Sequence, residues 1–257
     1  ADCSLTASLA DGEHLNRIFW YGINGSAELH SGVSPLSDAS HCLRCKAEYV
    51  YDYHTYAHLG GFRCPNCGYC RREPDFAVTQ IIRMDADRSE ILMQSPDGEQ
   101  RLSINLPAAY NLYNALAAAC ACHAMGIDSE TCRNALAGFS CGFGRLERFA
   151  LGAAGARMIL VKNPAGCSQA LDYIARTEGD FVLAVCLNDR GADGTDISWI
   201  WDADFDVLAE AYQGDELVVY GTRAEDMKLR LKYAGFDEDR ITLAATMDQL
   251  VERIEGS

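Results

Sequence analysis

The chain has 257 residues, enough for one large domain or two small ones. Its formal net charge of −15 argues against a nucleic-acid-binding protein, because such proteins need basic side chains to neutralise phosphates. No run of about eighteen apolar residues occurs and no signal-peptide pattern is visible, so we expect a soluble chain without a transmembrane helix.

The first residues predict little regular structure apart from a short strand over 17–22. The chain starts Ala-Asp-Cys without an initiator methionine, so we expect it to be a piece of a longer protein. A search for G-x-x-x-x-G-K-[ST], the loop that wraps nucleotide phosphates, finds no match in the sequence.

Residues 40–72 contain two C-x2-C pairs, with eighteen residues between Cys45 and Cys64. Four thiolates at this spacing are typical of a closed tetrahedral site, and therefore of a structural zinc ion bound by Cys42, Cys45, Cys64 and Cys67. The tyrosine-rich segment between the pairs predicts a β-hairpin that turns within 56–61. Together these features predict a zinc ribbon.

Three alternatives remain for this segment. The four cysteines could form two disulfides, but other cysteines lie in apolar patterns, which favours a reducing cytoplasmic compartment. A modest excess of basic residues in the ribbon leaves open nucleic-acid binding. Cys70 is a spare thiol, and the histidines that could replace a cysteine ligand are expected to be solvated or packed on the hairpin: His41, His54 and His58.

The middle of the chain predicts a sheet followed by two helices. Alternating segments within 76–106 predict strands of an antiparallel or mixed sheet, with a turn at Ser95–Gly98. Helical spacing predicts helices over 110–125 and 129–138, the second capped by Ser129. Asn111 and Asn114 lie three residues apart at the start of the first helix, where amides can hydrogen-bond a polar ring.

Residues 150–257 alternate between strands and helices, which predicts a parallel sheet. We expect strands over 157–161, 181–186, 216–220 and 240–243, and helices over 168–176, 224–233 and 247–254. Ligands of such sheets bind beyond the carboxyl ends of the strands. Two loops are expected there: 162–167, which begins Lys-Asn-Pro, and 188–202, which contains four aspartates and two tryptophans after the strand, among them Asp189, Asp193 and Asp196.

The segments AYNLYNALAA (109–118) and GRLERF (144–149), in this order, resemble the Mur ligase family, the ATP-dependent ligases of peptidoglycan synthesis. The resemblance implies an α/β fold. Residues 1–149 would be part of the central ATPase domain, with the ribbon inserted at 40–72, and 150–257 a Rossmann-like C-terminal domain. It also implies that Asn111 and Asn114 border adenine, that Arg145 reaches the nucleotide phosphates, and that ATP is used with Mg²⁺. The phosphate loop and its magnesium-binding hydroxyl would precede residue 1, so we expect this chain alone to be catalytically incomplete.

The four-cysteine insertion and the two loops narrow the resemblance to a branch of the family that amidates lipid II. There, a GatD-type glutamine amidotransferase subunit releases ammonia, and ATP activates the α-carboxylate of D-glutamate in the lipid II stem peptide to give D-isoglutamine. Asp189 is the expected third member of the partner's Cys–His pair, with Asp193 and Asp196 as alternatives. The implied location is cytoplasmic, at the inner face of the membrane through the lipid-linked substrate.

Two other functions stay open. A zinc-ribbon scaffold without catalysis agrees with the missing phosphate loop but leaves the Asn111, Asn114 and Arg145 set unexplained. An ordinary Mur-type amino-acid ligase is disfavoured because Lys162 stands where the family carries an acid, and no histidine follows it.

Overall fold

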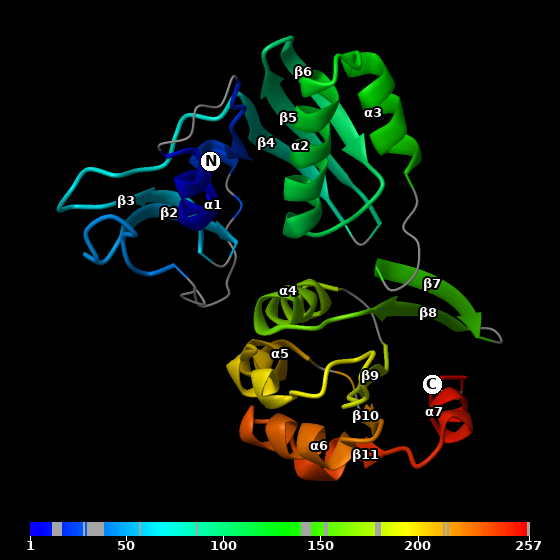
Figure 1. Ribbon diagram of the computed structural model, residues 1–257. Helices are drawn as coiled ribbons and strands as arrows, with labels where there is room; N and C mark the ends of the chain where they lie inside the picture. Colours follow the sequence, from blue (N-terminus) through cyan, green and yellow to red (C-terminus); the bar gives the residue numbers. More distant parts are fainter. Residues whose placement is uncertain are drawn as a thin grey trace. The chain divides into compact units, whose positions relative to one another are not determined.

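The computed structural model describes residues 1–11, 17–27, 29, 39–56, 58–85, 87–139, 145–151, 154–177, 181–212, 214 and 216–255. The chain divides into two compact units, unit 1 (1–140) and unit 2 (141–257), shown in Figure 1. Residues 140–144, which include the first residue of the segment GRLERF, lie outside the described residues. The assignment of 1–149 and 150–257 to the domains of a Mur ligase stays a prediction, and each unit is described by itself.

Unit 1 is built on a four-stranded sheet of order β1-β4-β5-β6. β1 pairs in parallel with β4, whereas β4, β5 and β6 pair antiparallel, which confirms the predicted mixed sheet. The strands are β1 (Tyr21–Ile23), β4 (Phe76–Met84), β5 (Ser89–Ser95) and β6 (Gly98–Ile104). The predicted turn is also confirmed, since Ser95 and Gly98 are paired and Gly98 has a φ of 105°.

Two helices, α2 (Ala109–Ala124) and α3 (Ser129–Gly138), pack against this sheet (Figure 1). The helical spacing of apolar residues brings Leu112 and Leu116 into the same core as the sheet residues Val78 and Ile91, and all four are fully buried. The cap of α3 is Asp128, which accepts a hydrogen bond from the amide of Thr131 at 2.8 Å. Ser129, the predicted cap, is instead the first helical residue, because the carboxylate one position earlier reaches the free amide.

The ribbon occupies the other part of unit 1. β2 (Val50–Tyr56) and β3 (Leu59–Arg63) form an antiparallel hairpin with its turn in the predicted segment. α1 (Ser4–Ala7) and the 3₁₀ turns η1 (Ser8–Ala10) and η2 (Gly25–Ala27) complete this part of the unit. The side chains that fill the ribbon core are aromatic: Tyr49, Phe62 and Tyr69, packed around Cys42 and Cys64.

A buried carboxylate joins the ribbon to the rest of unit 1. Asp2 is 2 % exposed. Its carboxylate accepts three hydrogen bonds, each at 2.7 Å: from Arg71, which follows the second C-x2-C pair (the second knuckle), from the amide of Ile23 in β1 and from the hydroxyl of Tyr113 in α2. Thr55 in β2 also contacts the hydroxyl of Tyr113. A buried charge is tolerated when it is paired and hydrogen-bonded, as Asp2 is.

Unit 2 contains a three-stranded parallel sheet of order β11-β10-β9. Its strands are β9 (Leu183–Cys186), β10 (Leu217–Tyr220) and β11 (Ile241–Leu243), and its helices are α4 (Pro164–Ala175), α5 (Phe205–Ala211), α6 (Ala224–Tyr233) and α7 (Met247–Glu255). Alternate residues of β10 face different cores. Leu217 and Val219 pack with α4, α5 and α6, whereas Val218 packs with Leu250 of α7. The 3₁₀ turns η3 (Ser198–Asp202) and η4 (Glu238–Arg240) lie between these elements.

One predicted strand of the parallel sheet was wrong. We predicted 157–161 as a buried strand, but β8 (Ala154–Ile159) pairs antiparallel with β7 (Arg145–Leu151) in a separate two-stranded sheet. Met158 is 40 % exposed and Leu160 is 50 % exposed, so the apolar run is not buried. Only two residues separate the strands in the sequence, and such a short connection favours a hairpin. The sequence also gave no indication of α5.

Candidate functional site

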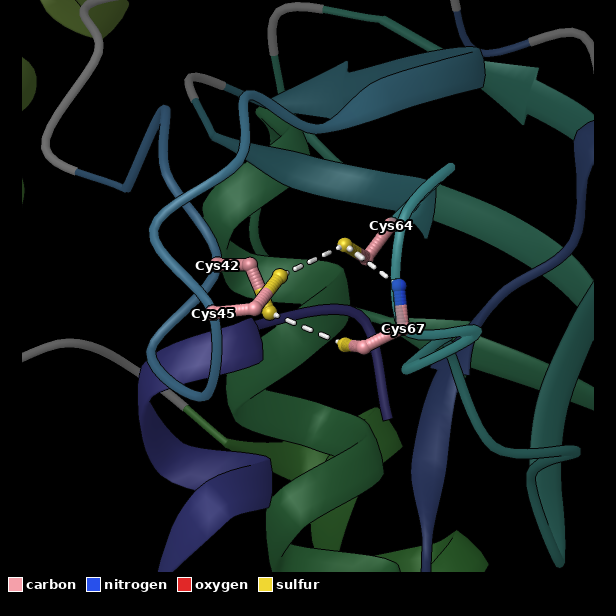
Figure 2. Close-up of side chains that lie close together, drawn as sticks. All are labelled: Cys42, Cys45, Cys64 and Cys67. Carbon is pink, nitrogen blue, oxygen red and sulfur yellow. Dashed lines mark hydrogen bonds between the residues drawn. The ribbon is translucent and has the colours of Figure 1, made fainter.

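The two C-x2-C pairs bring four sulfur atoms together in unit 1. The ligand atoms of Cys42, Cys45, Cys64 and Cys67 all lie within 4.8 Å of one another, and Figure 2 shows the side chains converging from two loops. The Sγ atoms of Cys42 and Cys67 are 3.6 Å apart, and those of Cys45 and Cys64 are 3.4 Å apart. A zinc–sulfur bond of about 2.3 Å gives a tetrahedron with edges of about 3.8 Å, so the cluster has the size of a zinc site.

The two loops that carry these cysteines have the same backbone geometry. In the first, Lys46 donates its amide hydrogen to the carbonyl of Cys42 at 2.8 Å, and in the second, Gly68 donates to Cys64 at 3.1 Å. Lys46 has a φ of 65° and Gly68 a φ of 75°, which is the left-handed conformation that glycine adopts without strain. The repeated turn directs both thiols of each pair inward, as a shared metal requires.

The electrostatics of the four thiols differ between the loops. Burial opposes ionisation of Cys42, but backbone amides of its own loop outweigh this effect and lower its pKa to about 6. The backbone amide of Tyr69 favours the thiolate of Cys67, but desolvation and the sulfurs of three neighbouring cysteines outweigh this effect and raise its pKa to about 12. Four adjacent thiolates repel one another, and a divalent cation compensates for that repulsion.

The other side chains that could have joined this cluster lie elsewhere. Cys70 is exposed, and each described cysteine is a free thiol. His41 contacts Ser40, His54 stacks on Tyr51, and His58 contacts Cys3. Three of the four arginines of the ribbon pair with acids: Arg44 with Asp11, Arg63 with Asp52 and Arg71 with Asp2. This pairing reduces the positive charge that the ribbon offers to a nucleic acid.

Asn111 and Asn114 occupy the first turns of α2, but only one of them is accessible. Asn111 is 3 % exposed, donates to the carbonyl of Pro107 at 2.5 Å and accepts from the amide of Asn114 at 3.3 Å. Asn114 is exposed. Asn111 therefore holds the start of the helix, and Asn114 is the side chain of the two that a ligand could reach.

The backbone directly before this helix is strained. Ala108 has a φ of 74° and a ψ of 146°, a conformation that residues other than glycine seldom adopt. Such conformations cost about 1–3 kcal/mol and often lie next to functional sites. Arg145, the third residue of the predicted nucleotide set, is the first residue of β7 in unit 2, where it pairs with Ile159. Contact of these three residues with a nucleotide stays a prediction.

The two loops of unit 2 lie in the described part of the chain. In the first, Asn163 caps α4 by accepting from the amide of Gly166 at 2.7 Å, and Lys162 donates to the carbonyl of Ala192 in the second loop at 3.3 Å. Arg230 of α6 is buried and donates to the carbonyls of Ile200 and Ala203, which fixes the far end of the second loop. No pattern in the sequence indicated this role of Arg230.

Among the candidate aspartates, Asp189 is the one held by two side chains. Its carboxylate accepts from the hydroxyl of Thr222 at 2.9 Å and from Arg223 at 3.2 Å, both just beyond the carboxyl end of β10. The Thr222 hydrogen bond, followed by that of Arg223, lowers the pKa of Asp189, which therefore stays ionised. Neither Thr222 nor Arg223 was singled out from the sequence.

The alternatives, Asp193 and Asp196, are both exposed. Asp196 accepts from the amide of Ser198 at 2.8 Å, and hydrogen bonds from Ser198 lower its pKa. These contacts are local turn contacts. The carboxylates of Asp193 and Asp196 are thus accessible to a partner but less firmly oriented than the carboxylate of Asp189.

The family model and the curated relatives that the sequence matches all carry the name MurT. Residues 160–257 match the MurT ligase C-terminal family. Over 215 residues, 84 % of its length, the chain is 34 % identical to the lipid II isoglutaminyl synthase (glutamine-hydrolyzing) subunit MurT of Streptococcus pneumoniae and covers 47 % of that protein. It is 32 % identical over 217 residues to the MurT subunit of Staphylococcus aureus, covering 84 % of this chain and 48 % of that one. The chain thus spans about half the length of the curated relatives it matches.

Comparison with solved structures gives the fold. A pseudomurein peptide ligase type C from Methanothermus fervidus aligns with a TM-score of 0.60 at 20 % identity, over 92 % of this chain and 52 % of the other. Folylpolyglutamate synthase of Mycobacterium tuberculosis, in complex with ADP, aligns with a TM-score of 0.53 at 22 % identity, over 71 % of this chain and 40 % of the other. The chain has the α/β fold of these ligases, and none of its described helices is long and apolar enough to cross a membrane.

Proposed function

Because this chain is a MurT-type member of the Mur ligase family, we propose that the protein it belongs to amidates lipid II. ATP activates the α-carboxylate of D-glutamate in the stem peptide as an acyl phosphate, and ammonia attacks it to give D-isoglutamine. The observation that carries this proposal is the similarity to MurT subunits over 84 % of the chain. The reaction takes place in the cytoplasm, at the inner face of the membrane that holds the lipid-linked substrate.

Asn114 and Arg145 are the proposed nucleotide contacts, and Asn111 positions Asn114. The exposure of Asn114 and its hydrogen bond to the buried Asn111 support these roles. An asparagine amide can donate to and accept from an adenine edge, and a guanidinium suits phosphate oxygens. Mg²⁺ is the proposed ion that neutralises phosphate charge in this site.

Zinc is the proposed metal of the four-cysteine cluster, with a structural role. A site of four thiolates leaves no position for a substrate, which distinguishes it from a catalytic zinc site. The size of the sulfur cluster and the paired turns that carry it support this assignment.

Ammonia is proposed to come from a GatD-type glutamine amidotransferase subunit, and Asp189 to orient the catalytic histidine of that partner. The MurT relatives are named as subunits of a glutamine-hydrolysing enzyme. Asp189 follows the carboxyl end of β9 and stays ionised between Thr222 and Arg223, so it could stabilise an imidazolium in a triad.

The test uses the full-length protein with its glutaminase partner. Asp189→Asn keeps the shape of the side chain but removes its charge, so glutamine hydrolysis should fall by orders of magnitude. Amidation supplied with free ammonia should persist, and complex formation should survive, because one rim carboxylate seldom dominates an interface. Asn114→Ala should weaken ATP binding by about 1 kcal/mol for each lost hydrogen bond.

Asp193→Asn and Asp196→Asn are the matched controls. If one of them abolishes glutamine hydrolysis while Asp189→Asn does not, the residue assignment is wrong and the shared triad stands. If none of the three affects glutamine hydrolysis, the shared triad is excluded. If the full-length protein neither uses ATP nor amidates lipid II with ammonia, the proposed activity is wrong. A zinc-ribbon scaffold without catalysis would then be the better explanation of the sequence.

A further inference from the structure

A thiol and an imidazole meet in unit 1, away from the metal cluster. The Sγ atom of Cys3 lies 3.3 Å from Nε2 of His58, although the two residues are 55 positions apart. Cys3 directly precedes α1, and His58 lies in the turn between β2 and β3. Neither residue belongs to the four-cysteine cluster, to the proposed nucleotide contacts or to the aspartate loop of unit 2.

The surroundings of Cys3 favour its thiolate. Burial raises the pKa of the thiol, but the contact with His58 and hydrogen bonding to Thr6 outweigh this and lower the pKa to about 7. By contrast, burial raises the pKa of Cys167 to about 12. Cys3 is partly exposed. Reactive cysteines are typically partly exposed and lie next to a group that stabilises the thiolate.

We propose that Cys3 is a nucleophilic thiol that forms mixed disulfides with low-molecular-weight disulfides, and that His58 positions and activates it. In this step the Cys3 thiolate attacks one sulfur of the small disulfide. A new sulfur–sulfur bond forms, the old one breaks, and the other half leaves as a thiolate. The proton of Cys3 passes to the imidazole of His58 or to solvent, so charge and electrons balance.

The reaction would occur where two segments of unit 1 join. The carbonyl of Asp2, next to Cys3, accepts a hydrogen bond from the amide of Gly60, two residues after His58. The side chain of Asp2 holds Arg71, and thereby the second knuckle of the ribbon. A small-molecule thiol attached to Cys3 would separate its sulfur from His58 and push the hairpin turn away from residues 1–3. Modification of Cys3 would therefore loosen the ribbon at this contact.

The test measures how fast individual cysteines of the zinc-loaded chain react. Iodoacetamide at pH 7 is the first probe and oxidised glutathione the second, and peptide mass spectrometry reports each cysteine separately. Cys186 of unit 2 is the internal reference, because it lies at the surface while desolvation by the surrounding protein raises the pKa of its thiol. Cys3 should react several-fold faster than Cys186 and should carry the mixed disulfide. Equal or slower reaction of Cys3 would overturn the proposal without any substitution.

Two variants separate the role of His58 from a general effect of the hairpin. His58→Gln removes the imidazole next to Cys3, whereas His54→Gln removes an imidazole that stacks on Tyr51 in the same hairpin. A thiol whose pKa returns from about 7 to its ordinary value of 9 loses about 50-fold in thiolate fraction at pH 7 and gains about eightfold in intrinsic nucleophilicity. His58→Gln removes the imidazole but leaves the hydrogen bonds from Thr6, so it should slow the alkylation of Cys3 by up to about sixfold, and His54→Gln should leave it unchanged.

Hydrogen exchange of the oxidised-glutathione product tests the structural consequence. Faster exchange at Gly60 in the modified chain, with unchanged exchange in unit 2, would support loosening at this contact. If the His58→Gln variant retains its zinc and its Cys3 is alkylated at the same rate as in the unaltered chain, the contact with His58 has no effect on reactivity. That result would overturn the role assigned to His58.

Discussion

Unit 1 and unit 2 each contain an arginine with a largely buried side chain, and the two guanidinium groups have different main partners. Arg71 in unit 1 pairs at 2.7 Å with Asp2, whose side chain is 2 % exposed. Arg230 in unit 2 donates to the carbonyls of Ile200 and Ala203, and its carboxylate partner, Asp206, is 64 % exposed. Arg71 also donates to the carbonyl of Ile23 and to the side chain of Asn24, but its charged partner is a buried carboxylate, whereas Arg230 donates mainly to backbone oxygens.

This difference extends to the units as wholes. The ribbon of unit 1 has a small aromatic core around cysteine side chains, so its stability depends on a metal and on buried polar contacts. Unit 2 packs helices on both faces of a parallel sheet with fully buried apolar residues such as Leu208 and Val218. Losing one polar group should therefore damage the ribbon of unit 1 more than unit 2.

The largest expected effect is that of removing the metal. Structural zinc contributes on the order of 10 kcal/mol to small zinc-dependent folds, so Cys64→Ser or a strong chelator should unfold residues 40–72. Unit 2 should keep its structure, because its apolar core does not depend on the cluster. Metal analysis should find about one zinc per chain before treatment, and hydrogen exchange should show loss of protection in the ribbon alone.

Cys70→Ser is the control for this experiment. Cys70 is exposed and lies close to the second knuckle, but it is not part of the cluster. Its replacement should leave the zinc content and the protection of 40–72 unchanged. A freshly purified chain without metal, with disulfides among the four cysteines, would exclude the ribbon as a zinc site.

A smaller effect is expected from the acids that face the two buried arginines. Asp2→Asn leaves the Arg71 charge unpaired in a buried position, and breaking a buried pair costs about 3–5 kcal/mol. Asp206→Asn removes an acid that is mostly exposed, so it should cost less than about 1 kcal/mol. Chemical denaturation, monitored in each unit by hydrogen exchange, measures the loss in free energy of unfolding for both variants. Similar losses in the two variants would contradict the proposed difference between the units.

The smallest effect concerns two helix caps. Asp128 caps α3 in unit 1, and Asn163 caps α4 in unit 2. Replacing either by alanine should cost about 1 kcal/mol at neutral pH. Only the first value should depend on pH, because the amide of Thr131 lowers the pKa of Asp128, whereas asparagine does not titrate.

The sign of that dependence follows from the lowered pKa. The contribution of Asp128 is complete above the ordinary aspartate pKa of 3.8 and is lost as the pH falls through the lower folded-state value. Denaturation at a series of pH values below neutrality should therefore show the cost of Asp128→Ala shrinking in acid. The cost of Asn163→Ala should stay constant, and a parallel decline in both would assign the effect to another group.

Local patterns gave most of the regular structure. The spacing of apolar residues predicted α2, α3, α6 and α7 to within a few residues, because each helix buries a face that repeats every three or four positions. The C-x2-C spacing predicted the four sulfurs that converge in Figure 2, since a tight turn brings both thiols of a pair to one side. Patterning was insufficient at β8, whose apolar run is compatible with a buried strand and with a hairpin.

The sequence by itself determined the secondary structure that depends on neighbouring residues: the amphipathic helices, the hairpin turns and the paired cysteine knuckles. The tertiary structure alone decided which distant side chains meet. Asp2 contacts Arg71 and Tyr113, Cys3 contacts His58, and Asp189 contacts Arg223. These contacts join residues at least 34 positions apart, and such pairs leave no periodic pattern in the chain. They arise because burial of the apolar faces fixes the surrounding elements, and polar groups near those faces then need partners.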